Sequence, residues 1–598
     1  MRTRLVVLVF VLAADSLQAA ATSQPAPAPP AAPVPAATKF VRIVPISLVW
    51  DQGYRTLAHV EAALDEAGAA GADLAVLPEV CADQPAEPIP GPAADAIARK
   101  AARHRMNVIG CLREKEGDKT YVTAFLCDRS GKIAGKYRKT HRLPREKDFE
   151  LGDRLVVLDT DIGAVGLKIG TDQYFPEIDM VYKRRGANLV AWCTSPWPVR
   201  DEHTTALSIQ GRAADYRLHY AVARYAGKRD YGGYRDAFSW TASWPIGRAQ
   251  VFDPDGHTLA DSGHAGGIAV ATVPAASLAS KARAGGLDTK GVYADLTAGK
   301  DKLPAPFARK ADTKRVIRTA TIECEGSVDK LLAKLDACGR AGCDVACLWE
   351  YVWYHNDDEA VKFRQRNSTW LARIAELAGR HKMYVVIAGE LERGFNEAIL
   401  YGRDGKEIAR YTKIIQTTSK ESKFYQAGQR VGIFDLDFGR VCLKICADVY
   451  APQIDRVAAL HQVDLMLFST QDAGPFTDHT RLRDYGRCLD NGYFLLRAAC
   501  QTAQTDHRTY VMDPWGMMLA GSQYHCDNEP LIVTLRLDNR PQYHEWPEET
   551  LKAGTYPDPY QRVDEKAKAN MYSARPRPLP KGELRAVLLA QRRPELYR

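Results

Sequence analysis

Apolar positions along the chain follow two alternating patterns, short continuous runs and longer stretches with apolar residues at every third or fourth position. A run at 41–49 precedes a stretch of helical spacing at 56–71, and a second run at 73–79 ends in a glutamate. Such runs are typical of buried strands, whereas the longer spacing is typical of amphipathic helices. Polar turns at 129–132 and 403–406 predict hairpins. Together these patterns predict an α/β fold with mixed sheets.

The same pattern occurs a second time, in the same order, in the C-terminal half of the chain. Strand-like runs at 315–323 and 344–350 flank a helix-like stretch at 328–342. The similar phrases are GADLAVLPEV (71–80) and GCDVACLWEY (342–351), LKIGTDQY (167–174) and LKICADVY (443–450), and GRAAD (211–215) and GRCLD (486–490). These matches lie 271 to 276 residues apart and occur in the same order in both halves, which chance similarity does not explain. The sequence therefore predicts two tandem copies of one domain.

The duplication and the composition around it set the predicted domain boundaries. The first domain covers 39–276 and the second covers 315–540. The segment 277–314 has no clear hydrophobic period, so we expect a linker between the two domains. From 541 to 598 the chain is rich in proline and charged residues. This composition predicts an extended tail that lies on the surface.

The N-terminus has the features of a secretory signal peptide over residues 1–21. Arg2 and Arg4 precede a short apolar run at 5–14, which is too short to span a bilayer and is followed by small alanines. A Pro/Ala-rich linker at 22–38 comes next. We therefore expect a protein exported to the periplasm or the extracellular space, with an uncleaved membrane anchor as the alternative.

Composition narrows the class of protein. The chain has 598 residues, which is too long for one ordinary hydrophobic core. Its hydrophobic fraction of 46% and its charged fraction of 26% are those of a globular protein. The net charge of +8 is spread along the chain, which disfavours nucleic-acid binding. No later apolar run is long enough to cross a bilayer, so we expect no membrane span once the signal peptide is removed.

Thirteen cysteines bear on the redox state and on metal binding. Export permits disulfides, and an odd number leaves at least one thiol unpaired within the chain. Cys338, Cys343 and Cys347 cluster, but they lack paired C-x-x-C spacing and no histidine follows at zinc-finger spacing. We therefore expect buried thiols or a disulfide in this cluster, and no metal site.

Three groups that support acyl transfer lie at predicted strand ends of the second copy. Cys446 lies where the apolar strand 441–446 gives way to the helical stretch 451–460. Free N–H groups at such a turn favour a thiolate and can hold an oxyanion. Glu350 ends a buried run, where burial favours the neutral acid and makes it a usable base, and Lys413 supplies a cation. A thiol, a carboxylate and an ammonium group suffice for nucleophilic catalysis.

The order of these residues, glutamate after a buried strand, lysine in Y-x-K and cysteine in K-I-C-x-D, resembles the nitrilase, or carbon–nitrogen hydrolase, superfamily. The resemblance covers nearly all of 40–275 and 315–540. It implies two αββα four-layer sandwich domains of nitrilase type, packed as an intrachain pseudo-dimer. It also implies that Cys446 is the nucleophile, Glu350 the general base and acid, and Lys413 the oxyanion stabiliser. No metal or organic cofactor is implied.

The same resemblance implies roles for further residues of the second copy. A second glutamate often follows the family's lysine, and Glu421 lies at that place. The backbone N–H near Ala447 would help to hold the oxyanion. Tyr351, Trp353 and Tyr354 would line the pocket or pack in the core. Members that hydrolyse nitriles often carry Trp-Glu after the cysteine, whereas Ala-Asp stands here, which favours amides.

The first copy keeps the acid and the cation but lacks the sulfur. Glu79 and Lys139 match the glutamate and lysine of the second copy, and Glu146 matches the second glutamate. Gly170 stands at the position of Cys446. Without a thiol no covalent acyl intermediate can form. We therefore expect an inactive domain that supplies buried surface and in which the acid and the lysine satisfy each other.

The predicted function is hydrolysis of a small-molecule, non-peptide amide by an exported enzyme. The family's Phe-Pro-Glu after the cysteine is Ala-Pro-Gln here, which leaves the substrate open. One alternative is a secreted binding protein built from two degenerate hydrolase domains, in which Cys446 is a core thiol. Another is a nitrile hydrolase or acyltransferase of the same superfamily. A papain-like protease is disfavoured, because its Cys-Trp signature and partner histidine motif are missing. Higher oligomers stay open.

Overall fold

The structure is a computed structural model, and it describes the following residues: 39–49, 56–144, 146–195, 202–226, 228–229, 244–245, 247–279, 293–298, 305, 307–308, 310, 312–323, 328–351, 357–392, 394–416, 421–471, 478–500, 509–522, 529–545 and 579–597. The predicted signal peptide and the Pro/Ala-rich linker lie outside the described residues. The chain divides into a short N-terminal unit, Met1–Lys39, and a second unit, Phe40–Arg598, which contains both predicted domains.

The first half of the second unit contains two large sheets among its described residues. One sheet has, in spatial order, β10 (Tyr225–Ala226), β1 (Phe40–Val49), β2 (Leu74–Val76), β3 (Asn107–Glu116), β4 (Lys119–Cys127) and β5 (Ile133–Arg138), with β15 (Gly267–Ile268) and β16 (Ala271–Pro274) also paired to β1. The other has β14 (Thr258–Asp261), β13 (Gln250–Phe252), β9 (His219–Ala223), β8 (Leu189–Cys193), β7 (Gly163–Ile169) and β6 (Val157–Thr160). A short hairpin pairs β11 (Lys228–Arg229) with β12 (Trp244–Pro245). Parallel pairs such as β1–β2 and antiparallel pairs such as β3–β4 make both sheets mixed.

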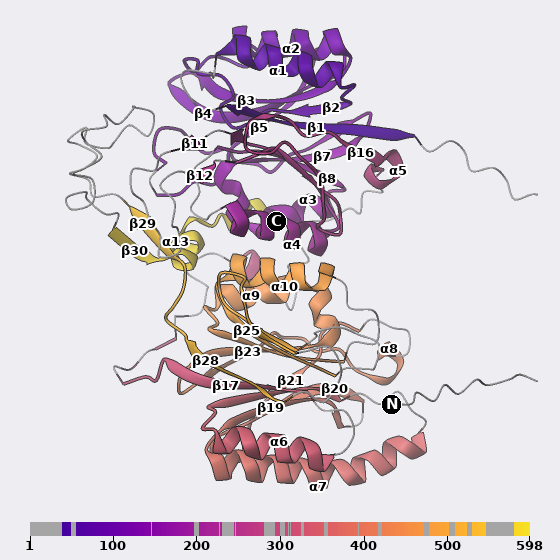
Figure 1. The fold of residues 1–598 in the computed structure, drawn as a ribbon, viewed down its shortest axis with the longest axis vertical. Coiled ribbons are helices and arrows are strands. Elements are labelled where there is room, and N and C mark those ends of the chain that lie inside the picture. The colour runs from indigo at the N-terminus through magenta and orange to yellow at the C-terminus, as the bar shows by residue number, and fades with distance from the viewer. Residues whose placement is uncertain are drawn as a thin grey trace, which may run out of the picture. The chain divides into compact units, whose positions relative to one another are not determined.

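Helices cover the outer face of each sheet of the first half (Figure 1). The β1 sheet carries α1 (Leu57–Ala69) and α2 (Pro92–His104), and the β7 sheet carries α3 (Pro176–Arg184) and α4 (Glu202–Tyr216). A single 3₁₀ turn, η1 (Gly170–Tyr174), connects β7 to α3, and α5 (Ala275–Leu278) follows the last strand. The order of layers is therefore helix, sheet, sheet, helix.

The second half repeats this architecture. Its first sheet contains β21 (Glu407–Thr412), β20 (Phe395–Tyr401), β19 (Tyr384–Glu392), β18 (Val345–Tyr351), β17 (Val316–Ile322) and β28 (Leu531–Arg536), and its second contains β22 (Gly432–Leu436), β23 (Gly439–Ile445), β24 (Leu465–Gln471), β25 (Phe494–Cys500), β26 (Tyr510–Met512) and β27 (Met518–Gly521). The outer helices are α6 (Val328–Arg340) and α7 (Asp357–His381) on the first sheet, and α9 (Pro452–Leu460) and α10 (Asp478–Asn491) on the second. The shorter elements are α8 (Glu421–Phe424) and the 3₁₀ turn η4 (Cys446–Tyr450). The predicted fold, two tandem αββα sandwiches, is confirmed.

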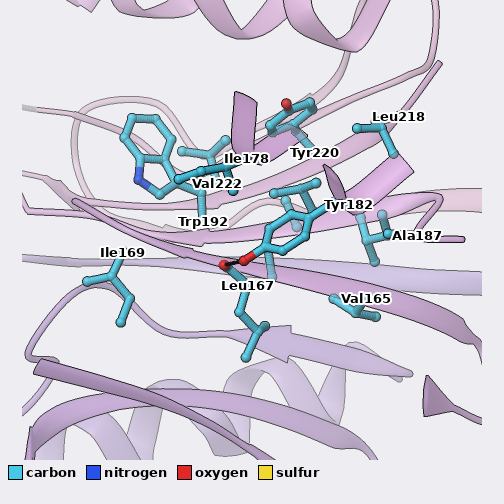
Figure 2. Close-up of a cluster of buried hydrophobic side chains, with 14 of the residues drawn as sticks. Val165, Leu167, Ile169, Ile178, Tyr182, Ala187, Trp192, Leu218, Tyr220 and Val222 are labelled. Carbon is cyan, nitrogen blue, oxygen red and sulfur yellow. Dashed lines mark hydrogen bonds between the residues drawn. The ribbon is translucent and has the colours of Figure 1, made fainter. Parts of the chain in front are cut away.

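The sequence pattern explains the layers of the core. On β2, Leu74 and Val76 join the apolar cluster that reaches the second sheet, called the inner apolar cluster below. Ala75 between them joins a separate cluster beneath α1 and α2. This alternation is the two-residue period of a strand. Figure 2 shows part of the inner cluster, in which the hydroxyl of Tyr182 donates to the backbone carbonyl of Leu167 in β7. The buried hydroxyl group is thus satisfied without leaving the apolar layer.

The two halves contact each other through α4 and α10, and the contact is reciprocal. Arg212 donates from Nε to Asp490 at 2.7 Å, and Arg487 donates from Nη2 to Asp215 at 2.6 Å. These four residues occupy matched positions of the repeated phrases GRAAD and GRCLD. All four side chains are buried. Each half therefore supplies an arginine to the aspartate of the other.

Two glycines at the same contact let the helices approach closely. A Cβ atom added to Gly211 would lie 2.8 Å from the Cα atom of Gly486, and one added to Gly486 would lie 2.9 Å from the Cα atom of Gly211. Equivalent residues that touch each other mark an isologous, two-fold interface. The duplicated chain thus pairs its halves as two copies of a subunit would pair. None of the described helices is long and apolar enough to cross a membrane.

The prediction of an extended surface tail over 541–598 is wrong for the part at its C-terminal end that the structure describes, 579–597. This part forms β30 (Leu579–Glu583), which pairs with β29 (Gln542–Glu545), then α13 (Leu584–Gln591) and η5 (Pro594–Tyr597). Leu584, Leu588 and Leu589 of α13 are buried in the inner apolar cluster of the first half. Their spacing along the sequence is helical, and the surrounding prolines and charges concealed it.

Charged contacts fix the end of the chain to the first half. Arg592 donates from Nε to the fully buried carboxylate of Glu177 at 2.6 Å, and Arg456 of α9 donates to the same oxygen at 2.9 Å. The hydroxyl of Tyr597 lies 2.9 Å from Nε2 of His141. The segment between the halves behaves similarly, because Asp295 of η2 (Ala294–Leu296) lies 2.7 Å from the imidazole of His461 at the end of α9. The segment that follows each half therefore contacts the other half.

Candidate active site

Cys446 lies at the sharp turn between β23 and α9, where the sequence pattern predicts it. Its φ is +37°, in the left-handed region that residues other than glycine rarely adopt. The turn follows from the local sequence, because the apolar strand ends at Ile445 and Pro452 begins the helix at a position that needs no N–H donor. The thiol is partly exposed. A strained backbone thus presents an accessible sulfur, as is common at functional sites.

The predicted acid, lysine and second glutamate meet in the interior of the second half. Lys413 Nζ lies 2.6 Å from Glu421 Oε1 and 3.4 Å from Glu350 Oε1. Each of the three side chains is 1% exposed. They come from three separate places, the end of β18, the residue after β21 and the start of α8. The structure therefore brings Glu350, Lys413 and Glu421 together.

The backbone of one residue connects the thiol to the acid. The N–H of Gln471, at the end of β24, donates to Glu350 Oε2 at 3.0 Å. The carbonyl of the same residue accepts a hydrogen bond from Cys446 Sγ at 3.6 Å. The sulfur and the carboxylate are thus both hydrogen-bonded to the backbone of Gln471, and the carboxylate also contacts Lys413 through its other oxygen.

The electrostatics of the site favour a charged lysine. Burial by itself lowers the pKa of Lys413, because it disfavours the ammonium form. The negative charges of Glu350, Cys446 and Glu421 outweigh burial and raise the pKa of Lys413 above its usual range. Lys413 is therefore an ammonium group at neutral pH, the form that stabilises a thiolate or a developing oxyanion.

An aspartate that the sequence reasoning left without a role holds the turn in place. Asp448 accepts hydrogen bonds from the backbone N–H groups of Ile445, at 3.0 Å, and Ile415, at 2.9 Å, and from the hydroxyl of Tyr411 at 2.6 Å. It thereby ties the nucleophile turn to the segment that carries the lysine. Asp172 does the same in the first half, where it accepts from the backbone before η1. The aspartate in both LKI phrases was the signal that could have revealed this role.

A family model of the carbon–nitrogen hydrolases matches two regions of the chain, residues 41–283 and 318–542. The chain belongs to the carbon–nitrogen hydrolase family. Each match covers one of the two αββα halves, so both copies derive from the same family domain.

Among curated relatives, the chloroplastic omega-amidase of Arabidopsis thaliana is 27% identical over 271 residues, which cover 40% of this chain and 69% of that protein. Omega-amidase NIT2 of Bos taurus is 30% identical over 222 residues, 33% of this chain and 75% of that protein. Among solved structures, a nitrilase-superfamily amidase from Nesterenkonia has a TM-score of 0.34 and 22% identity, and the match covers 41% of this chain and 95% of that one.

The first half of this carbon–nitrogen hydrolase holds its acid and lysine in a different arrangement. Lys139 Nζ lies 2.9 Å from Glu79 Oε1 and 2.6 Å from Glu146 Oε1. Gly170 has a φ of +46°, so the turn has the same backbone form as at Cys446. A Cβ atom added to Gly170 would lie 2.5 Å from Glu79 Oε2. The carboxylate of the acid therefore fills the space that a nucleophilic side chain would need.

A difference between the halves at one strand position accompanies the different position of the acid. In the second half, Asn396 donates from Nδ2 to Glu350 Oε1 at 2.7 Å. Its counterpart in the first half is Val122, because each residue accepts a backbone hydrogen bond from the lysine of its own half. Valine has no donor, and Glu79 instead lies closer to its lysine. Sequence reasoning missed Asn396, although an asparagine in the apolar strand Phe395–Tyr401 is an anomaly that could have revealed it.

Asn396→Val should lower kcat roughly 10- to 100-fold, because a hydrogen bond to a charged group contributes about 1.5 to 3 kcal/mol and positions the base. Steady-state kinetics on the full chain measure this effect. Asn396 acts through Glu350, so KM should change little and the acid limb of the pH profile should shift. The reverse change, Val122→Asn, is the matched control and should leave kcat unchanged. A loss confined to the melting temperature would show that Asn396 is only structural.

Some predicted site residues have no described side chain. Tyr351 closes β18, but the structure describes only its backbone, and Trp353 and Tyr354 lie outside the described residues. Ala447 follows the nucleophile in η4 and is buried, with 2% of its surface exposed. The aromatic lining of the pocket thus stays a prediction.

Proposed function

We propose that this carbon–nitrogen hydrolase is an exported amidase that cleaves small-molecule amides through a thioester on Cys446. The observation that carries the proposal is the convergence of Cys446, Glu350 and Lys413 in the second half. The names of the omega-amidase relatives and the Ala-Asp pair after the cysteine support amides as the substrate class. Export rests on the sequence of residues 1–21.

In the first half-reaction Glu350 removes the thiol proton, and the sulfur forms a bond to the carbonyl carbon of the amide. The carbonyl electron pair moves to oxygen, where Lys413 and the backbone N–H near Ala447 stabilise the negative charge. When the carbonyl reforms, the C–N bond breaks and Glu350 gives its proton to the departing nitrogen. Ammonia or an amine leaves, and the acyl group stays on Cys446 as a thioester.

In the second half-reaction water hydrolyses the thioester. Glu350 removes a proton from the water, whose oxygen attacks the acyl carbon, and the C–S bond breaks to release the acid. The sulfur regains the proton from Glu350. Glu421 holds Lys413 throughout, since it makes the shorter of the two contacts with the ammonium group. No metal or organic cofactor takes part in this scheme.

The first half has a supporting role in this proposal. It lacks a nucleophile, and its acid lies against the turn where the nucleophile would be. Its helix α4 packs against α10, where Arg487 and Asp490 of the second half pair with Asp215 and Arg212 of the first half. The first half therefore replaces the second subunit of a dimer.

A labelling experiment tests the nucleophile. Iodoacetamide at less than one equivalent should alkylate Cys446 rapidly and selectively in the full chain, because the other cysteines whose side chains the structure describes are buried. A panel of primary and secondary amides, assayed for ammonia or amine release, should then show an activity that alkylation removes. A matching panel of nitriles tests nitrile hydrolysis. Slow and uniform labelling together with no product release from any amide or nitrile would favour the binding-protein alternative.

A further inference from the structure

The C-terminal end of α6 places two cysteines of the second half side by side. The N–H of Cys343 donates to the carbonyl of Cys338 at 3.1 Å, and the N–H of Gly342 donates to the carbonyl of Gly339 at 2.9 Å. Gly342 has a φ of +73°. These two bonds and the left-handed glycine define a Schellman motif, in which the side chains three residues before and two residues after the helix end come into contact. The residues at these two places are Cys338 and Cys343.

The two thiols interact in a buried, apolar setting. Cys338 and Cys343 are 0% and 3% exposed and belong to the apolar cluster beneath α6 and α7. Their mutual contact, and then burial, raise the pKa of Cys338 above its usual range, and the same contact lowers the pKa of Cys343. The structure has both as reduced thiols. Cys343 is thus the better nucleophile of the pair.

The first half provides an internal comparison, because α1 ends in the same motif. Ala72 N–H donates to the carbonyl of Ala67 at 3.1 Å, Gly71 N–H donates to the carbonyl of Gly68 at 3.0 Å, and Gly71 has a φ of +72°. Alanines occupy both contacting positions there. The motif therefore forms without sulfur. The second half carries cysteines at the two positions that the motif brings together.

We propose that Cys338 and Cys343 form an intramolecular disulfide when the exported chain folds under oxidising conditions. The oxidant is a small-molecule or protein disulfide. The thiolate of Cys343 attacks one sulfur of the oxidant and releases its first thiol; Cys338 then loses its proton and attacks Cys343, which releases the second thiol. The two cysteines lose two protons and two electrons, and the oxidant is reduced to two thiols. Because neighbouring side chains cover both sulfurs in the folded protein, the exchange precedes the closure of this cluster.

The bond would fix the loop that leads from α6 into β18. Cys343 lies two residues before β18, and Glu350 lies near the end of that strand. α6 lies on the outer face of the sheet (Figure 1), and both cysteines belong to the apolar cluster formed with residues of α6 and α7. The inference rests on the export that is part of the proposed function, but its test does not use activity, so the two can fail separately.

Peptide mapping tests the proposal, since Arg340 lies between the two cysteines. The full chain is reduced, unfolded, refolded with excess oxidised glutathione, and then denatured in acid and alkylated. Trypsin should yield peptides 335–340 and 341–362 joined by a disulfide; reduction should release both, and their summed mass should exceed that of the joined species by about 2 Da. The peptide that contains Cys446 should be alkylated in the same sample. Complete alkylation of both Cys338 and Cys343 would overturn the proposal.

Two single variants assign the bond, and a double variant separates it from folding. Cys343→Ala should abolish the joined peptides, whereas Cys347→Ala should retain them, because Cys347 shares peptide 341–362 but not the motif. If Cys347→Ala abolished the joined peptides, the pairing would be with Cys347 and the proposal would be wrong. Cys338→Ala/Cys343→Ala should fold and keep its hydrolytic activity, since alanines fill the same positions in α1. Its melting temperature should match that of the reduced chain and lie below that of the oxidised chain by a few °C.

Discussion

Cys446→Ala should abolish amide hydrolysis, with kcat/KM reduced roughly 10⁴- to 10⁶-fold. Without the sulfur no thioester forms, and Glu350 and Lys413 have no acyl group on which to act. The fold should persist, because Gly170 shows that the same turn forms without a thiol. Amine release and melting temperature, measured on the same preparation, check both statements. Cys442→Ala, which removes a buried thiol from β23, is the control and should retain activity.

The reverse substitution tests the prediction that the first half is inactive, and the reason for it. Gly170→Cys, made in the Cys446→Ala background, should not restore hydrolysis. A Cβ atom at Gly170 would lie 2.5 Å from Glu79 Oε2, and that oxygen is held by the backbone N–H of Ser195 at 3.1 Å. The new sulfur would meet a carboxylate that lies in its place. Recovery of amine release in this double variant would mean that the missing sulfur alone inactivates the first half.

The residues that sequence reasoning found are those whose position depends on local pattern. Glu350 ends an apolar run and Cys446 lies between an apolar run and a proline, so strand and helix signals place both at element ends. The duplication then supplied the comparison that marks Gly170. The four-layer fold followed from the family resemblance, which was carried by the same residues.

The residues that sequence reasoning missed depend on pairing between distant segments. Asn396 meets Glu350 across β19, because Glu350 pairs with Ala388 and Ala388 pairs with Ala398, two residues beyond Asn396, and no local pattern encodes that register. Asp448 also accepts from the backbone N–H of Ile415, which belongs to a distant segment. The C-terminal segment was misjudged because its burial depends on Glu177, which lies 415 residues away from Arg592. The composition of a segment describes the segment itself and carries no information about the surface against which it packs.

The largest expected loss of stability follows from removing either buried lysine, as in Lys413→Met or Lys139→Met. Each ammonium group is 1% exposed and lies within 3.5 Å of two carboxylates. Removal of one partner from a buried ion pair costs about 3 to 5 kcal/mol, because the remaining carboxylates lose their counter-ion in a largely buried site. Both variants should therefore lose a similar unfolding free energy, which denaturant titration of the full chain measures.

This loss of stability should depend on pH with a defined sign. In Lys139→Met the pKa of Glu79 should lie further above the unfolded value of about 4.3, because burial raises it and the charge that lowers it is gone. Burial already raises the pKa of Glu79 with its lysine present. Above pH 4 the folded state then binds more protons than the unfolded state, so the stability of this variant falls as the pH rises. The deficit should be small near pH 4 and largest at neutral pH, and a deficit independent of pH would contradict this account.

Measurements of kcat should distinguish the role of Lys413 from that of Lys139. Lys413→Met should lower kcat by about 10²- to 10³-fold, because it removes the cation that faces the oxyanion. Lys139→Met should leave kcat unchanged at temperatures where it is folded, since its half has no nucleophile. The two variants lose the same kind of buried pair in the same chain, so any difference in kcat reports on chemistry rather than on folding. If both lost activity equally while folded, Lys413 would be a structural cation, and stabilisation of the oxyanion would have to come from the backbone of the turn alone.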